Sequence, residues 1–105
     1  MTIPLDAFNS KIFAGQLHTK FTVHLPGQAP VELELFEVKD RETAPQLELF
    51  SLGFRGPISP RLNQQIHRLE HEKLGVFELF LTAVGADQDG TLYEVVFHRF
   101  RNPQS

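Results

Sequence analysis

The sequence predicts a mainly β protein, either a small antiparallel β-barrel or a sandwich of about six strands. Three observations carry this prediction. Apolar and polar residues alternate along most of the chain, which is the two-residue period of half-buried strands. Ten phenylalanines, one tyrosine and no tryptophan provide large rings for an interior. With 105 residues the chain holds apolar material for one core, so we expect a single β-rich domain over residues 1–105.

The first part of the chain predicts a short helical turn followed by a strand. Leu5, Phe8 and Ile12 follow helical spacing near the N-terminus. Residues 17–25 then alternate apolar and polar side chains, and Pro26 ends this strand. One face of the strand is therefore expected to point into the core.

The next two predicted strands each contain a shift in phase. Within residues 31–38 the apolar role passes from Leu35 to its neighbour Phe36, and further on it passes from Leu49 to Phe50. Adjacent apolar residues at such a shift predict a β-bulge or a bend. Two strands bent in this way suit a small barrel.

The last third of the chain predicts a hairpin, with residues 77–84 and 91–100 joined by a loop at residues 85–90. Both arms are apolar at nearly every position, so each face of the hairpin carries apolar side chains. One face is expected to enter the core, namely Phe77, Leu79, Leu81, Tyr93, Val95 and Phe97. The opposite face is predicted to contact a second copy or another protein, because large exposed apolar patches are rare on monomers. Its residues are Val76, Phe80, Val84, Leu92, Val96 and Phe100.

Residues 59–74 are ambiguous. Local rules predict a helix, because a serine at the capping position is followed by a proline at the first helical position. Leu62, Ile66 and Leu69 would share one face of that helix. Whether the segment is a helix or a strand stays open at this point.

His67, Glu70 and His71 match the HxxEH pattern of inverted zinc proteases. On a helix, the two histidines would share a face and hold zinc, with Glu70 as general base and Glu78 or Glu94 as a third ligand. This is the enzymatic alternative, a metal-dependent hydrolase. A chain with five histidines also reaches this spacing by chance, and 105 residues hardly supply the long helical scaffold. We therefore expect no catalytic residue, no metal site and no cofactor.

Composition narrows the remaining function classes. The absence of cysteine removes disulfides, thiolate nucleophiles and cysteine-bound zinc. A net charge of −3 argues against a nucleic-acid partner. No stretch has the roughly 20 apolar residues of a membrane helix, and the first residues lack a secretion signal, so we expect a cytoplasmic protein without membrane contact. A third alternative is a small barrel that binds a flavin or nucleic acid.

Residues 50–57, which read FSLGFRGP, and residues 68–75, which read RLEHEKLG, resemble a family of small bacterial proteins catalogued only as a domain of unknown function. The likeness continues through residues 79–81 and 93–97. The resemblance implies a compact β-rich domain in which the segment around Leu69 is a strand, so that His67, Leu69 and His71 lie on one side. It also associates the chain with phage-tail-like or fibre systems.

Nothing in the chain assembles a nucleophile, a base and an orienting group. The function that the sequence favours is therefore a non-catalytic binding or assembly module. We expect it to form a homo-oligomer or to bind another protein, in a role accessory to a phage-tail-like or fibre system.

Overall fold

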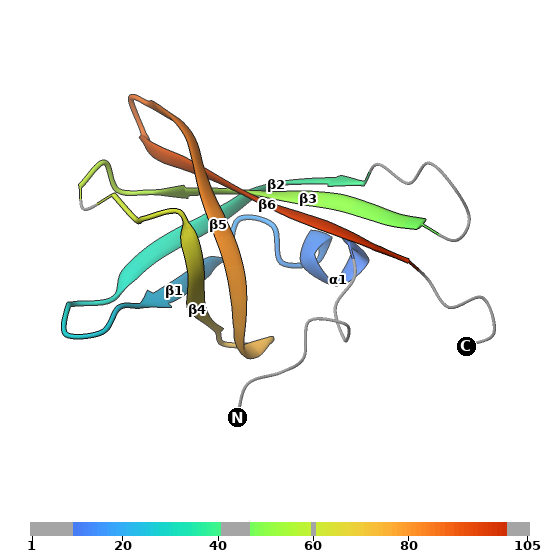
Figure 1. Cartoon of the computed structure of the whole chain (residues 1–105), viewed down its shortest axis with the longest axis horizontal. Coiled ribbons are helices and arrows are strands. Elements are labelled where there is room, and N and C mark those ends of the chain that lie inside the picture. Colours follow the sequence, from blue (N-terminus) through green and yellow to red (C-terminus); the bar gives the residue numbers. More distant parts are fainter. Residues whose placement is uncertain (1–9, 41–46, 60, 101–105) are drawn as a thin grey trace.

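The computed structural model describes residues 10–40, 47–59 and 61–100, and for residues 47, 48 and 98–100 the backbone alone. One short helix and six strands follow one another along the chain (Figure 1). They are α1 (Ser10–Ala14), β1 (Lys20–His24), β2 (Val31–Asp40), β3 (Leu47–Gly56), β4 (Gln65–His71), β5 (Gly75–Asp87) and β6 (Gly90–Phe100). Every pairing is antiparallel, and the sheet closes in a ring in the order β1-β2-β3-β6-β5-β4. The predicted mainly β fold is confirmed.

Two long strands form the corners of the ring, because each changes partner along its length. β2 pairs with β1 through Glu34 and with β3 from Glu34 onward. β5 pairs with β4 through Leu81 and with β6 from Thr82 onward. A β-bulge lies near each change, between Leu35 and Glu37 in β2 and between Ala83 and Gly85 in β5. Bulges increase the local twist and bend a strand, which lets one strand belong to two differently oriented parts of a sheet.

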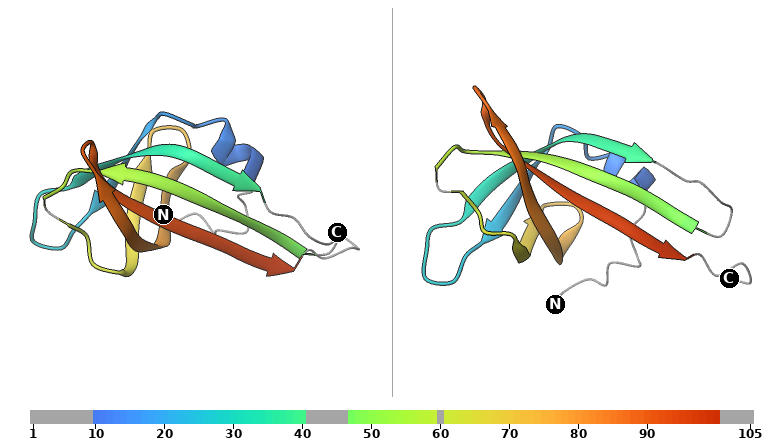
Figure 2. Two further views of the ribbon diagram at one scale, coloured as in Figure 1. Left: turned by 90° about the horizontal axis from the view of Figure 1, so that it is seen from above. Right: turned by 45° about the horizontal axis from the view of Figure 1, so that its top comes forward.

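Beyond the ring, the ends of β2, β3 and β6 continue as a three-stranded extension (Figure 2). Phe13, from α1, is fully buried against this extension. Its ring centroid lies 6.2 Å from that of Phe50 and 5.7 Å from that of Phe97, and those two rings stack with centroids 4.4 Å apart. α1 therefore covers the inner face of the extension.

A second group of rings fills the ring of strands. Phe21 contacts Phe54 and Phe77, with centroid distances of 5.2 and 6.1 Å. Phe77 also lies 6.3 Å from Phe13 and so joins the two groups of rings. Among the side chains that the structure describes, the buried hydrophobic ones are Phe13, Phe21, Val23, Val31, Leu33, Leu35, Phe50, Leu52, Phe54, Leu62, Leu69, Phe77, Leu79, Leu81, Tyr93, Val95 and Phe97. They include all six hairpin residues that the sequence assigned to the core.

The helical turn predicted near the N-terminus is present as α1 and includes Ile12. Leu5 and Phe8, which also carried that prediction, lie outside the described residues. The bulge predicted at Leu35 is confirmed. The shift predicted at Leu49 is wrong, because β3 pairs with β6 without interruption from Leu47 to Gly56.

Residues 59–74, for which the sequence leaves helix and strand both open, contain β4, so the strand that the resemblance implies is correct and the helical alternative is not. β4 is paired on both sides, to β1 and to β5, so its backbone hydrogen bonds come from neighbouring strands rather than from a helical turn. His67, Leu69 and His71 are buried, whereas Ile66 is 62% exposed. The alternation of β4 thus follows the period of a strand, and the helical spacing of Leu62, Ile66 and Leu69 is coincidental.

The hairpin of β5 and β6 turns more tightly than predicted. The two strands pair as far as Asp87 and Gly90, which leaves only residues 88 and 89 in the turn. The backbone N–H of Asp89 donates to Oδ1 of Asp87 at 2.9 Å, and this bond, together with Arg55, lowers the pKa of the Asp87 carboxyl. An aspartate that bonds its own turn in this way is a common device for closing tight turns.

Candidate functional site

The two histidines of the HxxEH pattern lie inside the ring, on β4. His67 and His71 are 4% and 3% exposed. Nε2 of His67 donates to the backbone carbonyl of Asn63 at 2.8 Å. Residues two or four apart on a strand point to the same side, so both imidazoles belong to the core side of β4.

His71 is held on both ring nitrogens. Nδ1 accepts the backbone N–H groups of Lys73 and Leu74, at 3.0 and 3.2 Å. The proton therefore sits on Nε2, which donates to Oγ1 of Thr19 at 2.8 Å, and the Thr19 hydroxyl donates to the carbonyl of Gln16. Burial lowers the pKa of His71 from its ordinary value of 6.5, Glu72 partly opposes this, and Lys73 adds to it. His71 thus acts as a neutral clamp for the β4–β5 turn.

The acidic members of the zinc hypothesis lie on the other side of the sheet. Glu70 is exposed, and its Oε1 lies 2.8 Å from Nε2 of His24. Glu78 pairs in register with Arg68 on the same outer side. Glu94 alternates with the buried Tyr93 and Val95, so it too points outward. Across the part of the chain that the structure describes, no three His, Asp or Glu side chains gather as a metal would require.

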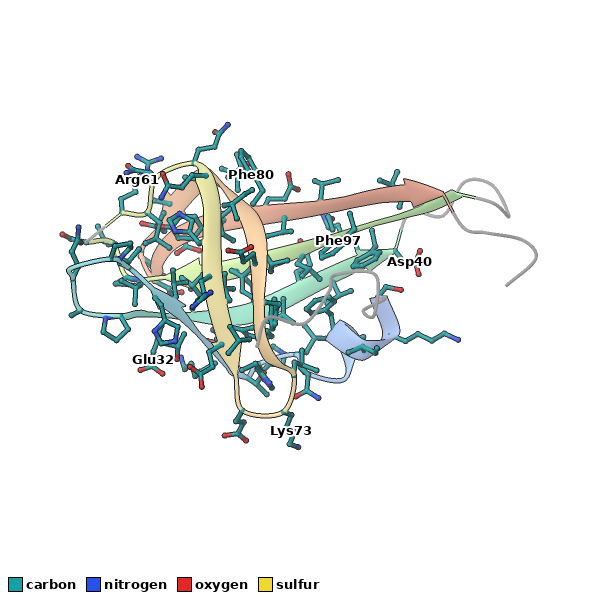
Figure 3. The ribbon with its side chains drawn as sticks, turned by 60° about the horizontal axis from the view of Figure 1, so that its bottom comes forward. Glu32, Asp40, Arg61, Lys73, Phe80 and Phe97 are labelled. Atoms are coloured by element: carbon teal, nitrogen blue, oxygen red, sulfur yellow. The ribbon has the colours of Figure 1, made fainter. Side chains whose placement is uncertain are left out.

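Those hairpin residues predicted to contact a partner whose side chains are described lie on the outside of the ring. Phe80, Val84 and Val96 are 49%, 57% and 58% exposed. Val76 and Leu92 are less exposed than these three. Phe100 ends β6, and its side chain lies outside the described part. Figure 3 shows Phe80 at the outer surface and Phe97 on the inner side, toward α1. Contact with a partner at these positions stays a prediction.

Sequence reasoning missed one outward residue, Ile66. It lies on β4 directly opposite Phe80 on β5 and is 62% exposed. The helical interpretation placed it in the core, whereas the alternation of His67, Leu69 and His71 would have placed it outside. We call the exposed apolar side chains of β4, β5 and β6 the outer patch: Ile66, Phe80, Val84 and Val96.

Three small hollows lie in the described surface. A pocket of about 180 Å³ lies at one mouth of the ring, between Leu25, Arg61 and His67 among others. Another of about 120 Å³ lies beside Val96 on the outer side of β3 and β6, and a third of about 250 Å³ lies near Lys20 and Arg55. These three are below the roughly 300 Å³ at which pockets for drug-sized ligands begin. They give no support to the flavin alternative.

A family model described as "Domain of unknown function (DUF6916)" matches residues 8–97. The chain belongs to this family. The DUF6916 match runs from before α1 to within three residues of the end of β6, so the whole ring and its helix lie within it. The resemblance to a domain of unknown function is therefore confirmed. No curated protein and no solved structure matches the chain.

Within the described ranges, no helix is both long and apolar enough to cross a membrane.

Proposed function

We propose that this chain is a non-catalytic module that binds protein through the outer patch. The observation that carries the proposal is the directly opposed pair Ile66 and Phe80, which are 62% and 49% exposed on neighbouring strands. Two large apolar side chains side by side on a sheet cost free energy in water, and association recovers it. Val84 and Val96 add apolar surface on β5 and β6.

The non-catalytic part of the proposal is supported by the state of the histidines. His67 and His71 face inward and form hydrogen bonds with the backbone of their own chain, while Glu70 points outward to His24. A general base and its metal ligands have to converge on one accessible point. This supports a structural role for the HxxEH residues over the metal-dependent hydrolase.

Metal analysis of untagged protein tests this part. We expect substoichiometric zinc, and we expect a chelator to leave the unfolding midpoint unchanged. One tightly held ion per chain, with a fall in thermal stability after chelation, would favour the metal-dependent hydrolase over the non-catalytic module.

A bait comparison tests the binding part. Immobilised wild-type protein and the variants Phe80→Glu and Ile58→Glu are incubated with cell extract, and bound proteins are quantified by mass spectrometry. Ile58 is a matched control because it is 62% exposed but lies in the loop after β3. We expect bound protein, including further copies of the chain, to be lost with Phe80→Glu and kept with Ile58→Glu. Identical recovery on all three baits would reject the outer patch as the binding surface.

We further propose a narrower setting, a bacterial cytoplasmic module accessory to a phage-tail-like or fibre system. The cysteine-free sequence supports a reducing compartment. Genes for tail or fibre components beside those of family members, and such components among the proteins lost with Phe80→Glu, are the expected results.

A further inference from the structure

The outer side of β4 and β5 consists of three rows of directly opposed residues. In strand register, Ile66 lies opposite Phe80, Arg68 opposite Glu78, and Glu70 opposite Val76. These residues alternate with inward-facing ones, so the rows lie on the outer side of the two strands. Apolar, charged and mixed pairs thus follow one another along one two-stranded surface.

The central row contains opposite charges that do not pair with each other. Arg68 and Glu78 are both exposed and directly opposed, yet neither forms an ion pair within the described chain. Directly opposed side chains have Cβ atoms about 4.5–5.5 Å apart, which is within easy reach of an arginine and a glutamate. Both side chains therefore remain available for a charged partner above the sheet.

We propose that two copies of the chain associate face to face through these rows, about a two-fold axis that runs parallel to the strands and lies above the outer surface, over the midline between β4 and β5. This rests on the proposed binding function and names its partner. A rotation of 180° about that axis places β4 of one copy over β5 of the other at the same level. Arg68 then faces Glu78 of the second copy, and Ile66 faces its Phe80. Each contact occurs twice.

The complementarity follows from the register alone. A two-fold interface needs a surface in which each residue meets a suitable residue of the same surface. Because Arg68 and Glu78 have opposite charges and Ile66 and Phe80 are both apolar, exchanging the two strands preserves the favourable contacts of these two rows. Packed sheets lie about 10 Å apart, a gap that an arginine and a glutamate span together.

The interface is small, because only two strands of a curved ring meet their counterparts. We expect a weak dimer with a dissociation constant on the order of micromolar. Phe80 and Ile66 supply the buried apolar surface, and the two Arg68–Glu78 contacts set the orientation.

Charge reversal tests the arrangement by sedimentation velocity across a concentration series. Arg68→Glu sets two carboxylates together at each of the two charged contacts, and Glu78→Arg sets two guanidinium groups together at each. Each variant is expected to weaken the dimer about tenfold or more. The controls Lys73→Glu and Glu72→Arg carry the same charge changes in the β4–β5 turn, outside the rows, and are expected to leave the dissociation constant within about threefold of wild type. Circular dichroism checks that each variant is folded.

Mixing the two reversed chains is the decisive step. In a mixture, the Arg68→Glu chain presents two acidic residues and the Glu78→Arg chain presents two arginines, so both contacts of the heterodimer are complementary. We expect the mixture, and the double variant Arg68→Glu/Glu78→Arg alone, to regain an affinity within about threefold of wild type. A role of either charge within one chain would not produce recovery on mixing.

The outcomes separate this inference from the proposed function. A wild-type chain that stays monomeric at millimolar concentration overturns the dimer, while the bait comparison still decides whether the outer patch binds another protein. A dimer that Phe80→Glu abolishes but charge reversal does not affect overturns the two-fold arrangement only. A dimer that forms equally well with Phe80→Glu overturns the proposed face-to-face contact, and the bait comparison again decides whether the outer patch binds another protein.

Discussion

The two faces of β5 carry similar side chains, but those on one face are buried and those on the other are exposed to water. Phe77 is fully buried between Phe13 and Phe21, whereas Phe80, three residues further along the same strand, is 49% exposed. Both residues are phenylalanine, so their different exposure comes from the side of the sheet to which each side chain points. We therefore expect the inner face to determine stability and the outer face to be available for association. Hydrophobicity of a strand is therefore not by itself evidence that both of its faces are covered.

The largest expected effect contrasts these two rings. Phe77→Ala should lower the free energy of unfolding by about 3–5 kcal/mol, because it leaves a cavity where two groups of rings meet. Phe80→Ala should change it by about 1 kcal/mol or less. Urea unfolding followed by circular dichroism at low protein concentration measures both. If Phe77→Ala does not fold, Phe77→Leu provides the inner value at a smaller loss, of about 1–2 kcal/mol. Equal losses at both positions would contradict the contrast.

A smaller loss of unfolding free energy is expected when the buried hydroxyl of Tyr93, on β6, is removed. Its hydroxyl oxygen accepts the backbone N–H of Leu62 at 2.8 Å, and both groups are buried. Tyr93→Phe leaves that N–H without a partner and should cost about 1–2 kcal/mol in the same assay. Unchanged stability would mean that the loop before β4 does not depend on this bond.

The buried His71 should make stability depend on pH. Because burial holds its pKa below 6.5 in the folded chain, the unfolded chain binds more protons as the pH falls below that value. Its contribution is thus complete above about pH 6.5 and is lost as the pH falls toward the folded pKa. Urea midpoints between pH 5 and 8 should fall less steeply on the acid side for His71→Gln than for wild type. Parallel curves would sink this interpretation.

The smallest effect is expected at Glu70, the neighbour of His71 on the opposite face. Its ion pair with His24 is open to water at both partners, with side-chain exposures of 53% and 44%. Glu70→Gln should change the free energy of unfolding by about 0.5 kcal/mol or less, because water screens such pairs. A loss as large as that of Tyr93→Phe would show that the outer face contributes to stability, contrary to the contrast between the two faces.

Much of the fold could be predicted because strand alternation is a local signal. Phe21 and Val23, or Tyr93 and Val95, identify their inner faces without knowledge of any partner strand. The state of β4 could not be predicted in this way, because Leu62, Ile66 and Leu69 fit a helix locally and the strand is enforced by β1 and β5 on either side. The change of partner in β5 and its bulge at Ala83 depend likewise on the closed ring.

The candidate site could be predicted only in part, because alternation is a local signal and strand pairing is not. The exposure of Phe80, Val84 and Val96 could be predicted from alternation within the hairpin. The exposure of Ile66 was missed, because the helical alternative placed that residue in the core. The opposed pairs Ile66–Phe80 and Arg68–Glu78 exist only through strand register, which no single segment encodes.

Phe13 has a consequence for local opening of the molecule. A helix of five residues has no stability of its own, so α1 persists only while Phe13 stays packed on Phe50 and Phe97. Those two rings lie on the stretch of β3 and β6 beyond the residues at which β5 pairs with β6. Helix and extension should therefore form one cooperative unit whose amide protons exchange together, and faster than those of the closed ring.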